Sequence, residues 1–229
     1  MLNIKELKIY SNNKPLVDIK LYIKKSIALV GESGSGKSLT LKSILKLLPS
    51  NLTSVFKYES NFDLNPNNIG FIPQNPFTSL SPLTKIKDQF FCNKKQQESM
   101  LKMVNLNPDT LNKFPAQLSG GQLQRVVIAI VLSKEPKILL LDEPTTALDK
   151  KTQQLILNLI VRLQKKLNFL ILFVTHDINS IKNICEDIII LKDGLIIESG
   201  KTLDILENSI EKYTNNLIQS NFASREYRI

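Results

Sequence analysis

The chain has few cysteines and no long apolar run. Only two cysteines occur among its 229 residues, Cys92 and Cys185, and their spacing fits neither a metal-binding motif nor a disulfide framework. The longest uninterrupted apolar stretch is residues 126–132, whereas a membrane-spanning helix needs about 18 residues. Residues 1–6 carry charges where a signal peptide would have an apolar segment. These absences predict a soluble protein that works in the reducing cytoplasm.

Acidic residues are fewer than basic ones. The chain has 30 lysines and arginines against 21 aspartates and glutamates, which gives a formal net charge of +9. That surplus is compatible with a nucleic acid or an anionic membrane surface as partner. However, the lysines are scattered, for example at Lys24 and Lys25 and at Lys150 and Lys151, and form no single basic block. A lysine-rich solvated surface is therefore the simpler interpretation.

A glycine-rich segment at residues 31–38 carries the clearest motif. Its sequence, GESGSGKS, fits G-x-x-x-x-G-K-[ST], the loop whose backbone N–H groups wrap the phosphates of a nucleotide. An apolar run at residues 27–30 predicts a buried strand before the loop, and residues 39–48 predict a helix after it. We expect Lys37 to face the β- and γ-phosphates and Ser38 to offer its hydroxyl to Mg²⁺. The residues predicted to bind the nucleotide are Gly31, Ser33, Gly34, Ser35, Gly36, Lys37, Ser38 and Leu39.

Apolar and helical segments alternate along much of the chain. Continuous apolar runs at residues 69–72, 138–141 and 169–174 are typical of buried strands, and helical patterns occur at about 121–133 and 152–167. This alternation predicts an α/β protein with a parallel sheet that is covered on both faces and binds ligands at the carboxyl ends of its strands.

Other segments depart from this alternation. Residues 17–23 alternate apolar and polar side chains, which predicts a strand that pairs antiparallel with residues 2–9. Residues 188–197 predict a hairpin turned at an Asp-Gly pair. We interpret about 75–133 as an inserted helical subdomain, and we expect the tail, residues 201–229, to be helical and then frayed.

Polar side chains follow several of the predicted strands, whose carboxyl ends can meet at one edge of the sheet. Asp142 is placed to hold Mg²⁺ directly or through water, and Glu143 to orient or deprotonate an attacking water. Gln74 could contact both the metal and the water. His176, the only histidine, could contact a γ-phosphate. The alternatives are an ordinary acidic loop and a structural histidine.

A second segment with two glycines, LSGGQ at residues 118–122, precedes a predicted helix. A serine cap, two glycines and a helix N-terminus suit the binding of an anion. The segment lies too far along the chain to belong to the same half-site as residues 31–38. A second anion-binding helix end in one ATPase makes sense if it faces the nucleotide of another subunit.

In these motifs the chain resembles the ATP-binding subunits of ABC transporters. Residues 31–38 and 138–143 (ILLLDE) resemble the Walker A and Walker B segments of that family, and residues 118–122 resemble its signature motif. The other matching positions are the Q-loop at Gln74, the D-loop at residues 147–149 and the switch histidine at His176. Tyr10 falls where the adenine-stacking aromatic is expected, and Tyr22 is the neighbouring alternative.

The resemblance implies one ABC nucleotide-binding domain over residues 1–229, with a P-loop NTPase (RecA-like) core, a small antiparallel β lobe and an inserted helical subdomain. It implies an ATPase that uses ATP and Mg²⁺ and serves transmembrane permease subunits at the cytoplasmic face of the cell inner membrane. Two such subunits would form a head-to-tail dimer around two ATP molecules. The residues implied to face the partner's ATP are Ser119, Gly120, Gly121, Gln122 and Asp149. The implied metal ligands are Ser38, Gln74 and Asp142.

A narrower resemblance is to the peptide/nickel importer branch. Residues 73–83 (PQNPFTSLSPL) resemble its Q-loop, and residues 211–214 (EKYT) resemble its late Pro-Tyr-Thr segment, with Lys212 in place of proline. Oligopeptide-type members usually carry a longer, cysteine-containing C-terminal extension, which this sequence lacks. Nickel or metal-chelate import is therefore favoured over di- or oligopeptide import. The branch also implies a related second ATP-binding subunit, hence a heterodimer, and a solute-binding protein that helps to select the cargo.

A nucleic-acid-linked ATPase of the same superfamily is the alternative function. A repair or chromosome ATPase would separate its two halves by a long coiled coil, and no heptad repeat of that length occurs between residues 38 and 118. A translation factor would carry two such cassettes, and this chain has one. Transport, with no nucleic-acid partner, is the predicted function.

Residues 75–117 connect Gln74 to the LSGGQ segment, so we expect them to pass motion to a membrane subunit. Pro76 and Pro82 interrupt helix formation there. The apolar side chains expected to line a groove for a short permease helix are Phe77, Leu80, Leu83 and Phe90. The alternative is that they form the core of the insert.

Overall fold

The computed structural model describes residues 1–223. It contains two compact units, one made of residues 1–64 and 170–223 and the other of residues 65–169. The second unit is larger than the predicted insert at 75–133, because two strands and a long helix belong to it as well. The grouping of both units into one nucleotide-binding domain stays a prediction, and the expected frayed tail beyond residue 223 lies outside the described residues.

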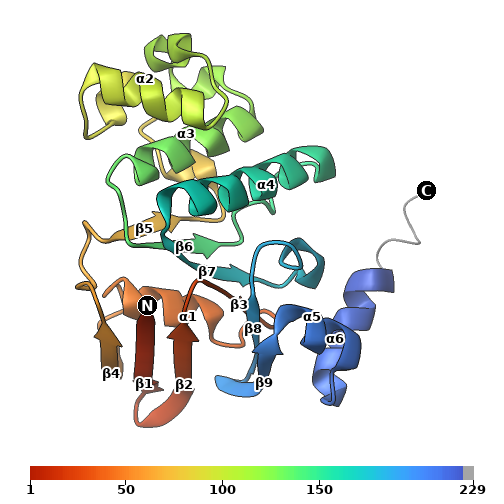
Figure 1. Cartoon of the computed structure of the whole chain (residues 1–229). Helices are drawn as coiled ribbons and strands as arrows, with labels where there is room; N and C mark the ends of the chain where they lie inside the picture. Colours follow the sequence, from red (N-terminus) through yellow and green to blue (C-terminus); the bar gives the residue numbers. More distant parts are fainter. Residues whose placement is uncertain (224–229) are drawn as a thin grey trace. The chain divides into compact units, whose positions relative to one another are not determined.

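The first unit combines a β lobe with a parallel core (Figure 1). Its elements are β1 (Leu2–Ser11), β2 (Lys14–Ile23), β3 (Ser26–Val30), α1 (Lys37–Ile44), β4 (Leu52–Ser60), β7 (Leu170–Thr175), the 3-10 helix η5 (Ile178–Ser180), β8 (Asp187–Lys192), β9 (Leu195–Lys201), α5 (Thr202–Asn208) and α6 (Lys212–Ala223). As predicted, β1 pairs antiparallel with β2, and β4 pairs with the other edge of β1. These three strands form the β lobe. Strand β3 runs parallel to both β7 and β8, and β8 forms the predicted hairpin with β9.

Hydrophobic alternation explains the difference between the lobe and the core. In β1, Leu2, Ile4 and Leu7 are fully buried while the residues between them are more exposed, as expected for a strand with one wet face. All residues of β3 are buried, as expected for a parallel strand covered on both faces. Helix α1 ends at Ile44 and not at residue 48 as predicted, because the backbone turns into a left-handed conformation at Lys46 (φ 58°).

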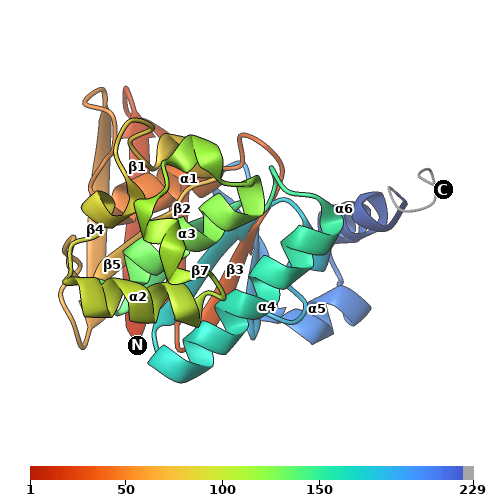
Figure 2. The same ribbon diagram turned by 90° about the horizontal axis from the view of Figure 1, so that it is seen from above.

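The second unit pairs two parallel strands with a group of helices. Its elements are β5 (Ile69–Ile72), the 3-10 helices η1 (Pro76–Thr78) and η2 (Ile86–Gln89), α2 (Lys94–Met103), the 3-10 helices η3 (Pro108–Asn112) and η4 (Pro115–Gln117), α3 (Gly120–Leu132), β6 (Ile138–Asp142) and α4 (Lys150–Leu167). Strands β5 and β6 run parallel. Helix α3 packs against α2 on one side and α4 on the other (Figure 2).

The insert is helical, as predicted, and its short helices other than η2 begin at prolines or at side-chain caps. Asn93 and Gln96 form a reciprocal capping box at the start of α2. Two of the four side chains expected to line a docking groove are buried, since Leu80 is 9% exposed and Phe90 is 8% exposed. In contrast, Phe77 and Leu83 are 56% and 89% exposed. Among the described residues, no helix has the length and apolarity that a bilayer crossing requires.

The turn between β8 and β9 depends on one glycine. Gly194 has a φ of 79°, and an added Cβ would lie 2.0 Å from the carbonyl oxygen of Leu16. Its backbone accepts a hydrogen bond from the N–H of Asp18 at 2.8 Å and donates one to the carbonyl oxygen of Ser35 at 3.0 Å. The turn therefore ties the β lobe to the loop that follows β3.

We expect Gly194→Ala to lower the free energy of unfolding by about 2 kcal/mol or more, since it adds both left-handed strain and a clash with backbone. For a chain of this size each kcal/mol corresponds to roughly 2–4 °C in Tm, which calorimetry can measure. Gly200→Ala is the matched control, because its Cβ would lie 3.4 Å from Ile205, an ordinary contact. Equal losses in the two variants would contradict this account of the turn.

Candidate active site

The first unit carries the predicted phosphate loop between β3 and α1. At Gly31 the loop passes so close to β8 that an added Cβ would lie 2.2 Å from the carbonyl oxygen of Leu191. Gly34 and Gly36 have φ values of 85° and 107°, a region that glycine adopts without steric cost. The path of the backbone therefore requires the glycines of the motif.

Lys37 folds back over this loop. Its Nζ donates hydrogen bonds to the carbonyl oxygens of Gly31 and Glu32, both at 2.7 Å, and its side chain is buried. Helix α1 starts directly after Gly36, which has no side chain to cap the helix, and the first turn contains no acidic residue. Such a helix start favours an anion through its N–H groups and its dipole.

His176 follows β7 in the same unit, and its side chain is exposed. The hydroxyl of Thr175 accepts a hydrogen bond from the N–H of Asp177 at 2.9 Å, which turns the chain at this point. The carbonyl oxygen of His176 accepts one from Nδ2 of Asn221 in α6, at 3.4 Å. The imidazole is thus presented at the end of a buried parallel strand, where ligands of α/β proteins bind.

Tyr10 lies at the end of the β lobe that approaches the phosphate loop. It follows Ile9, which pairs with Val17, and Val17 is close enough to Gly36 that an added Cβ there would lie 2.8 Å from its Cγ2. Tyr22 stands nearer the other end of the lobe, 49% exposed. The position of Tyr10 therefore agrees better with an adenine contact than that of Tyr22.

In the second unit, Glu143 follows β6 and Asp142. Its φ of 45° is unusual for a residue other than glycine and costs on the order of 1 kcal/mol. Oε2 of Glu143 accepts hydrogen bonds from Nε2 of Gln74 at 3.3 Å and from the hydroxyl of Thr146 at 3.2 Å. The structure thus brings Gln74 to Glu143. The sequence analysis missed Thr146, whose only signal is a hydroxyl three residues after the acid.

The LSGGQ segment forms the start of α3. Ser119 is the N-cap, and its hydroxyl accepts a hydrogen bond from the N–H of Gln122 at 3.3 Å, while Oε1 of Gln122 accepts one from the N–H of Ser119 at 3.1 Å. Gly121 allows close packing on α4, because an added Cβ would lie 2.5 Å from Cγ2 of Thr152. This reciprocal capping box fixes the direction in which the helix start points.

A cavity of about 290 Å³ opens beside this helix start, between α3 and α4. It is lined by Ser119, Gly120, Gly121, Gln122, Arg125, Ala147, Leu148, Asp149 and Thr152. Asp149 caps α4 by accepting a hydrogen bond from the N–H of Thr152 at 3.0 Å, which is the main reason that the pKa of its carboxyl is lowered. Arg125 was missed, although a basic residue so soon after a predicted anion site is a usable signal.

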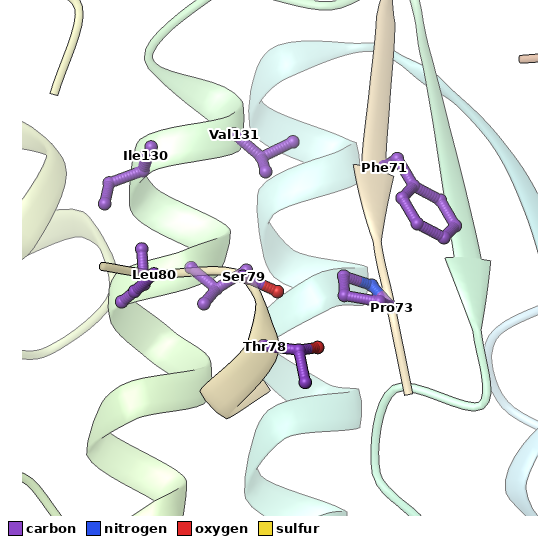
Figure 3. A pocket seen from close by; sticks show the side chains of 8 residues that line it. Phe71, Pro73, Thr78, Ser79, Leu80, Ile130 and Val131 are labelled. Atoms are coloured by element: carbon purple, nitrogen blue, oxygen red, sulfur yellow. The ribbon is translucent and has the colours of Figure 1, made fainter. Parts of the chain in front are cut away.

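A second cavity of the second unit, of about 420 Å³, is apolar (Figure 3). The residues that line it come from the end of β5, the η1 segment and α3: Phe71, Pro73, Thr78, Ser79, Leu80, Val127, Ile130 and Val131. Leu80 is therefore part of the cavity wall.

The predicted site residues divide between the two units. Those of the first unit are Tyr10, the phosphate-loop residues from Gly31 to Leu39, and His176; those of the second unit are Gln74, residues 119–122, Asp142, Glu143 and Asp149. The residues predicted to bind the phosphates of the chain's own ATP therefore lie in the first unit, and the carboxylate predicted to act as the base lies in the second.

Known proteins share this arrangement of sequence and fold. The ABC transporter family model matches residues 16–146. The oligopeptide transport ATP-binding protein OppD of Lactococcus lactis subsp. cremoris (strain SK11) is 34% identical over 91% of this chain and 70% of its own length. The oligopeptide transport ATP-binding protein AppD of Bacillus subtilis (strain 168) is 35% identical over 96% of this chain and 78% of its own length.

Solved structures agree with this result. CbiO1 of Clostridium perfringens, part of the ABC transporter complex CbiONQ, superimposes with a TM-score of 0.78 and 27% identity over 98% of both chains. An ATP-binding cassette solved as a dimer in a post-hydrolysis state, with ADP and Pi, gives a TM-score of 0.71 and 31% identity over 88% of this chain and 99% of the other. The chain therefore belongs to the ABC transporter family, with the fold of its nucleotide-binding domain, and it is an ATPase coupled to transport.

Proposed function

We propose that this chain hydrolyses ATP to drive the import of di- or oligopeptides through a membrane permease. The observation that carries the hydrolytic part is the Glu143 carboxylate, which is held by Gln74 and Thr146 at the end of a parallel strand. The peptide part is supported by relatives named as oligopeptide and dipeptide transport proteins. Nickel import stays a prediction that none of these names supports.

In this proposal the first unit binds the phosphates. The uncapped start of α1 supplies N–H groups, and Lys37 supplies a positive charge that the carbonyl oxygens of Gly31 and Glu32 hold at the loop. Tyr10 stacks on the adenine, and His176 contacts the γ-phosphate. All of these groups act by position and charge, which is the main protein contribution to phosphoryl transfer.

The second unit supplies the base. Glu143 accepts a proton from the attacking water, and Gln74, whose amide already reaches this carboxylate, orients that water. The oxygen donors of Ser38, Gln74 and Asp142 suit Mg²⁺, which binds hydroxyl, amide and carboxylate oxygens. When bound, the ion would neutralise phosphate charge.

Completion of the site requires a second ATP-binding subunit. The start of α3 and Asp149 line one cavity of the second unit. Their resemblance to the signature motif and D-loop of the family supports assigning them to the ATP of a facing subunit. A dimer is known for the similar cassette solved with ADP and Pi. In the proposed importer, this chain forms a heterodimer with a related ATP-binding chain. The heterodimer lies on the cytoplasmic face of the inner membrane and works with a permease and a solute-binding protein.

The apolar cavity of the second unit is the proposed docking site for a cytoplasmic helix of the permease. Its wall includes Leu80. Phe77 and Leu83, whose side chains are exposed, lie three residues before and after Leu80 in the sequence. The segment that carries them lies between Gln74 and Ser119, so both of its ends belong to the ATP site. A helix seated there would therefore sense the state of the nucleotide. A nucleic-acid partner has no comparable support.

We expect Glu143→Gln to lower ATP turnover by on the order of 10²–10⁴-fold while ATP still binds, because only the base is lost. Lys37→Ala should instead weaken ATP binding. ATP turnover is measured at steady state, and ATP binding by titration with a fluorescent ATP analogue, for both variants. Glu207→Gln, which removes an exposed carboxylate on α5, is the control for lost charge. Near-normal turnover in Glu143→Gln would exclude Glu143 as the base.

A test of the facing subunit uses Ser119→Arg, which places a long cation where the partner's γ-phosphate should bind. We expect turnover of the assembled pair to fall by about 10²-fold or more, as when a transition-state donor is lost. ATP binding by the separate chain should be unchanged. Ser54→Arg on β4 is the control for an added arginine. Loss of ATP binding by the separate Ser119→Arg chain would show that Ser119 serves its own nucleotide.

For the docking site, we expect Phe77→Ser combined with Leu83→Ser to weaken assembly with the permease by at least about tenfold and to abolish transport, since apolar anchors dominate interfaces. Basal ATP turnover and Tm should stay the same because both side chains are exposed. Leu155→Ser, which removes an exposed leucine from α4, is the control. Full transport by the double variant would place the permease elsewhere.

A further inference from the structure

Tyr213 reaches the phosphate loop from the opposite end of the chain. It is the second residue of α6, and its hydroxyl accepts a hydrogen bond from the backbone N–H of Glu32 at 3.2 Å. Both residues lie in the first unit, 181 positions apart in the sequence. Nothing in the proposed ATP chemistry uses this tyrosine.

The N–H that Tyr213 holds belongs to the peptide group that joins Gly31 to Glu32. A trans peptide group is planar, and its N–H and C=O point in opposite directions. The C=O of this group, on Gly31, accepts a hydrogen bond from Nζ of Lys37 at 2.7 Å. One rigid group therefore has the phenol oxygen on one side and the phosphate-binding ammonium on the other. An ammonium on the C=O also polarises the N–H, which strengthens its bond to the phenol.

Several contacts hold Tyr213 in place. Nζ of Lys192, at the end of β8, lies 4.9 Å from the centre of its ring. The segment just before α6 is held by Glu198 of β9. Its carboxylate accepts hydrogen bonds from the hydroxyl of Ser209 at 2.8 Å and from the N–H of Ile210 at 3.0 Å. Burial is the main cause that raises the pKa of Tyr213, so the phenol is neutral at physiological pH and can accept from an N–H.

The other end of α6 reaches the loop after β7. Nδ2 of Asn221 donates to the carbonyl oxygen of His176 at 3.4 Å, and α6 packs against η5 in that loop. One helix thus touches both loops of the first unit that are assigned to phosphate contacts. Its position can therefore affect how both loops are presented.

We propose that Tyr213 is a positioning residue for ATP binding, which orients the Gly31–Glu32 peptide group and through it the ammonium of Lys37. In this role Tyr213 affects how well ATP is bound and leaves the chemical step to Glu143. Helix α6 then belongs to the nucleotide site, although it contributes no atom to the reaction.

The test is Tyr213→Phe, which removes one oxygen and keeps the ring over which Lys192 lies. We expect the Kd and the KM for ATP to rise about 2- to 10-fold, the effect of one neutral hydrogen bond. The kcat at saturating ATP should stay the same, and the Tm without nucleotide should fall by no more than a few degrees, because one hydrogen bond of the folded chain is lost. Tyr58→Phe, on β4 of the same unit, is the matched control and should change none of these values. An unchanged Kd, or a lower kcat at unchanged Kd, would overturn the proposal.

Two further measurements separate positioning from a general structural role. Amide hydrogen exchange of Glu32 in the nucleotide-free chain should become faster in Tyr213→Phe and not in Tyr58→Phe, because only the first removes the acceptor. In a double-mutant cycle, Tyr213→Phe should add little to the loss of ATP affinity in Lys37→Ala, since it acts through Lys37. Unchanged exchange at Glu32, or an additive loss of affinity, would show that Tyr213 does not act through this peptide group.

Discussion

The close approach of the phosphate loop to strands β2 and β8 is the constraint on which the rest of the first unit depends. The loop lies against β8 at Gly31 and against β2 at Gly36, with no room for a Cβ at either point. The turn after β8 adds a backbone hydrogen bond from Gly194 to Ser35. The contacts at Gly31 and Gly194 are between backbone atoms, whereas Gly36 meets the side chain of Val17. The predicted nucleotide-facing side of the loop is therefore left to N–H groups and to Lys37. The β lobe and the hairpin between β8 and β9 therefore fix the backbone of the predicted anion site.

Local patterns in the sequence predicted most of the fold. Period-two alternation located the antiparallel strands, and uninterrupted apolar runs located β3, β6 and β7, because burial on one or two faces leaves a direct trace in the order of residues. The end of α1 was wrong by several residues, since the left-handed turn at Lys46 has no glycine or proline to indicate it. The site residues were predicted from the motifs and from the resemblance to the family.

Features that depend on distant contacts could not be predicted. An apolar side chain in a proline-rich loop looks the same in sequence whether it faces a partner or its own core. Leu80, which is buried, could therefore not be told apart from Phe77, which is exposed. The left-handed backbone of Glu143 has no signal in residue type. The bond from Glu32 to Tyr213 joins two ends of the chain, and only the packing of α6 on the first unit brings them together.

The capping box at Ser119 has a consequence for the choice of residue at that position. A hydroxyl has lone pairs and one hydrogen, and Ser119 uses a lone pair to hold the N–H of Gln122. The hydrogen can still be donated, so one side chain can terminate its own helix and bond an incoming phosphate at the same time. An aspartate would cap α3 equally well, yet its carboxylate would repel that phosphate. In the proposed role of this helix start, a small neutral group that both accepts and donates meets the two demands together.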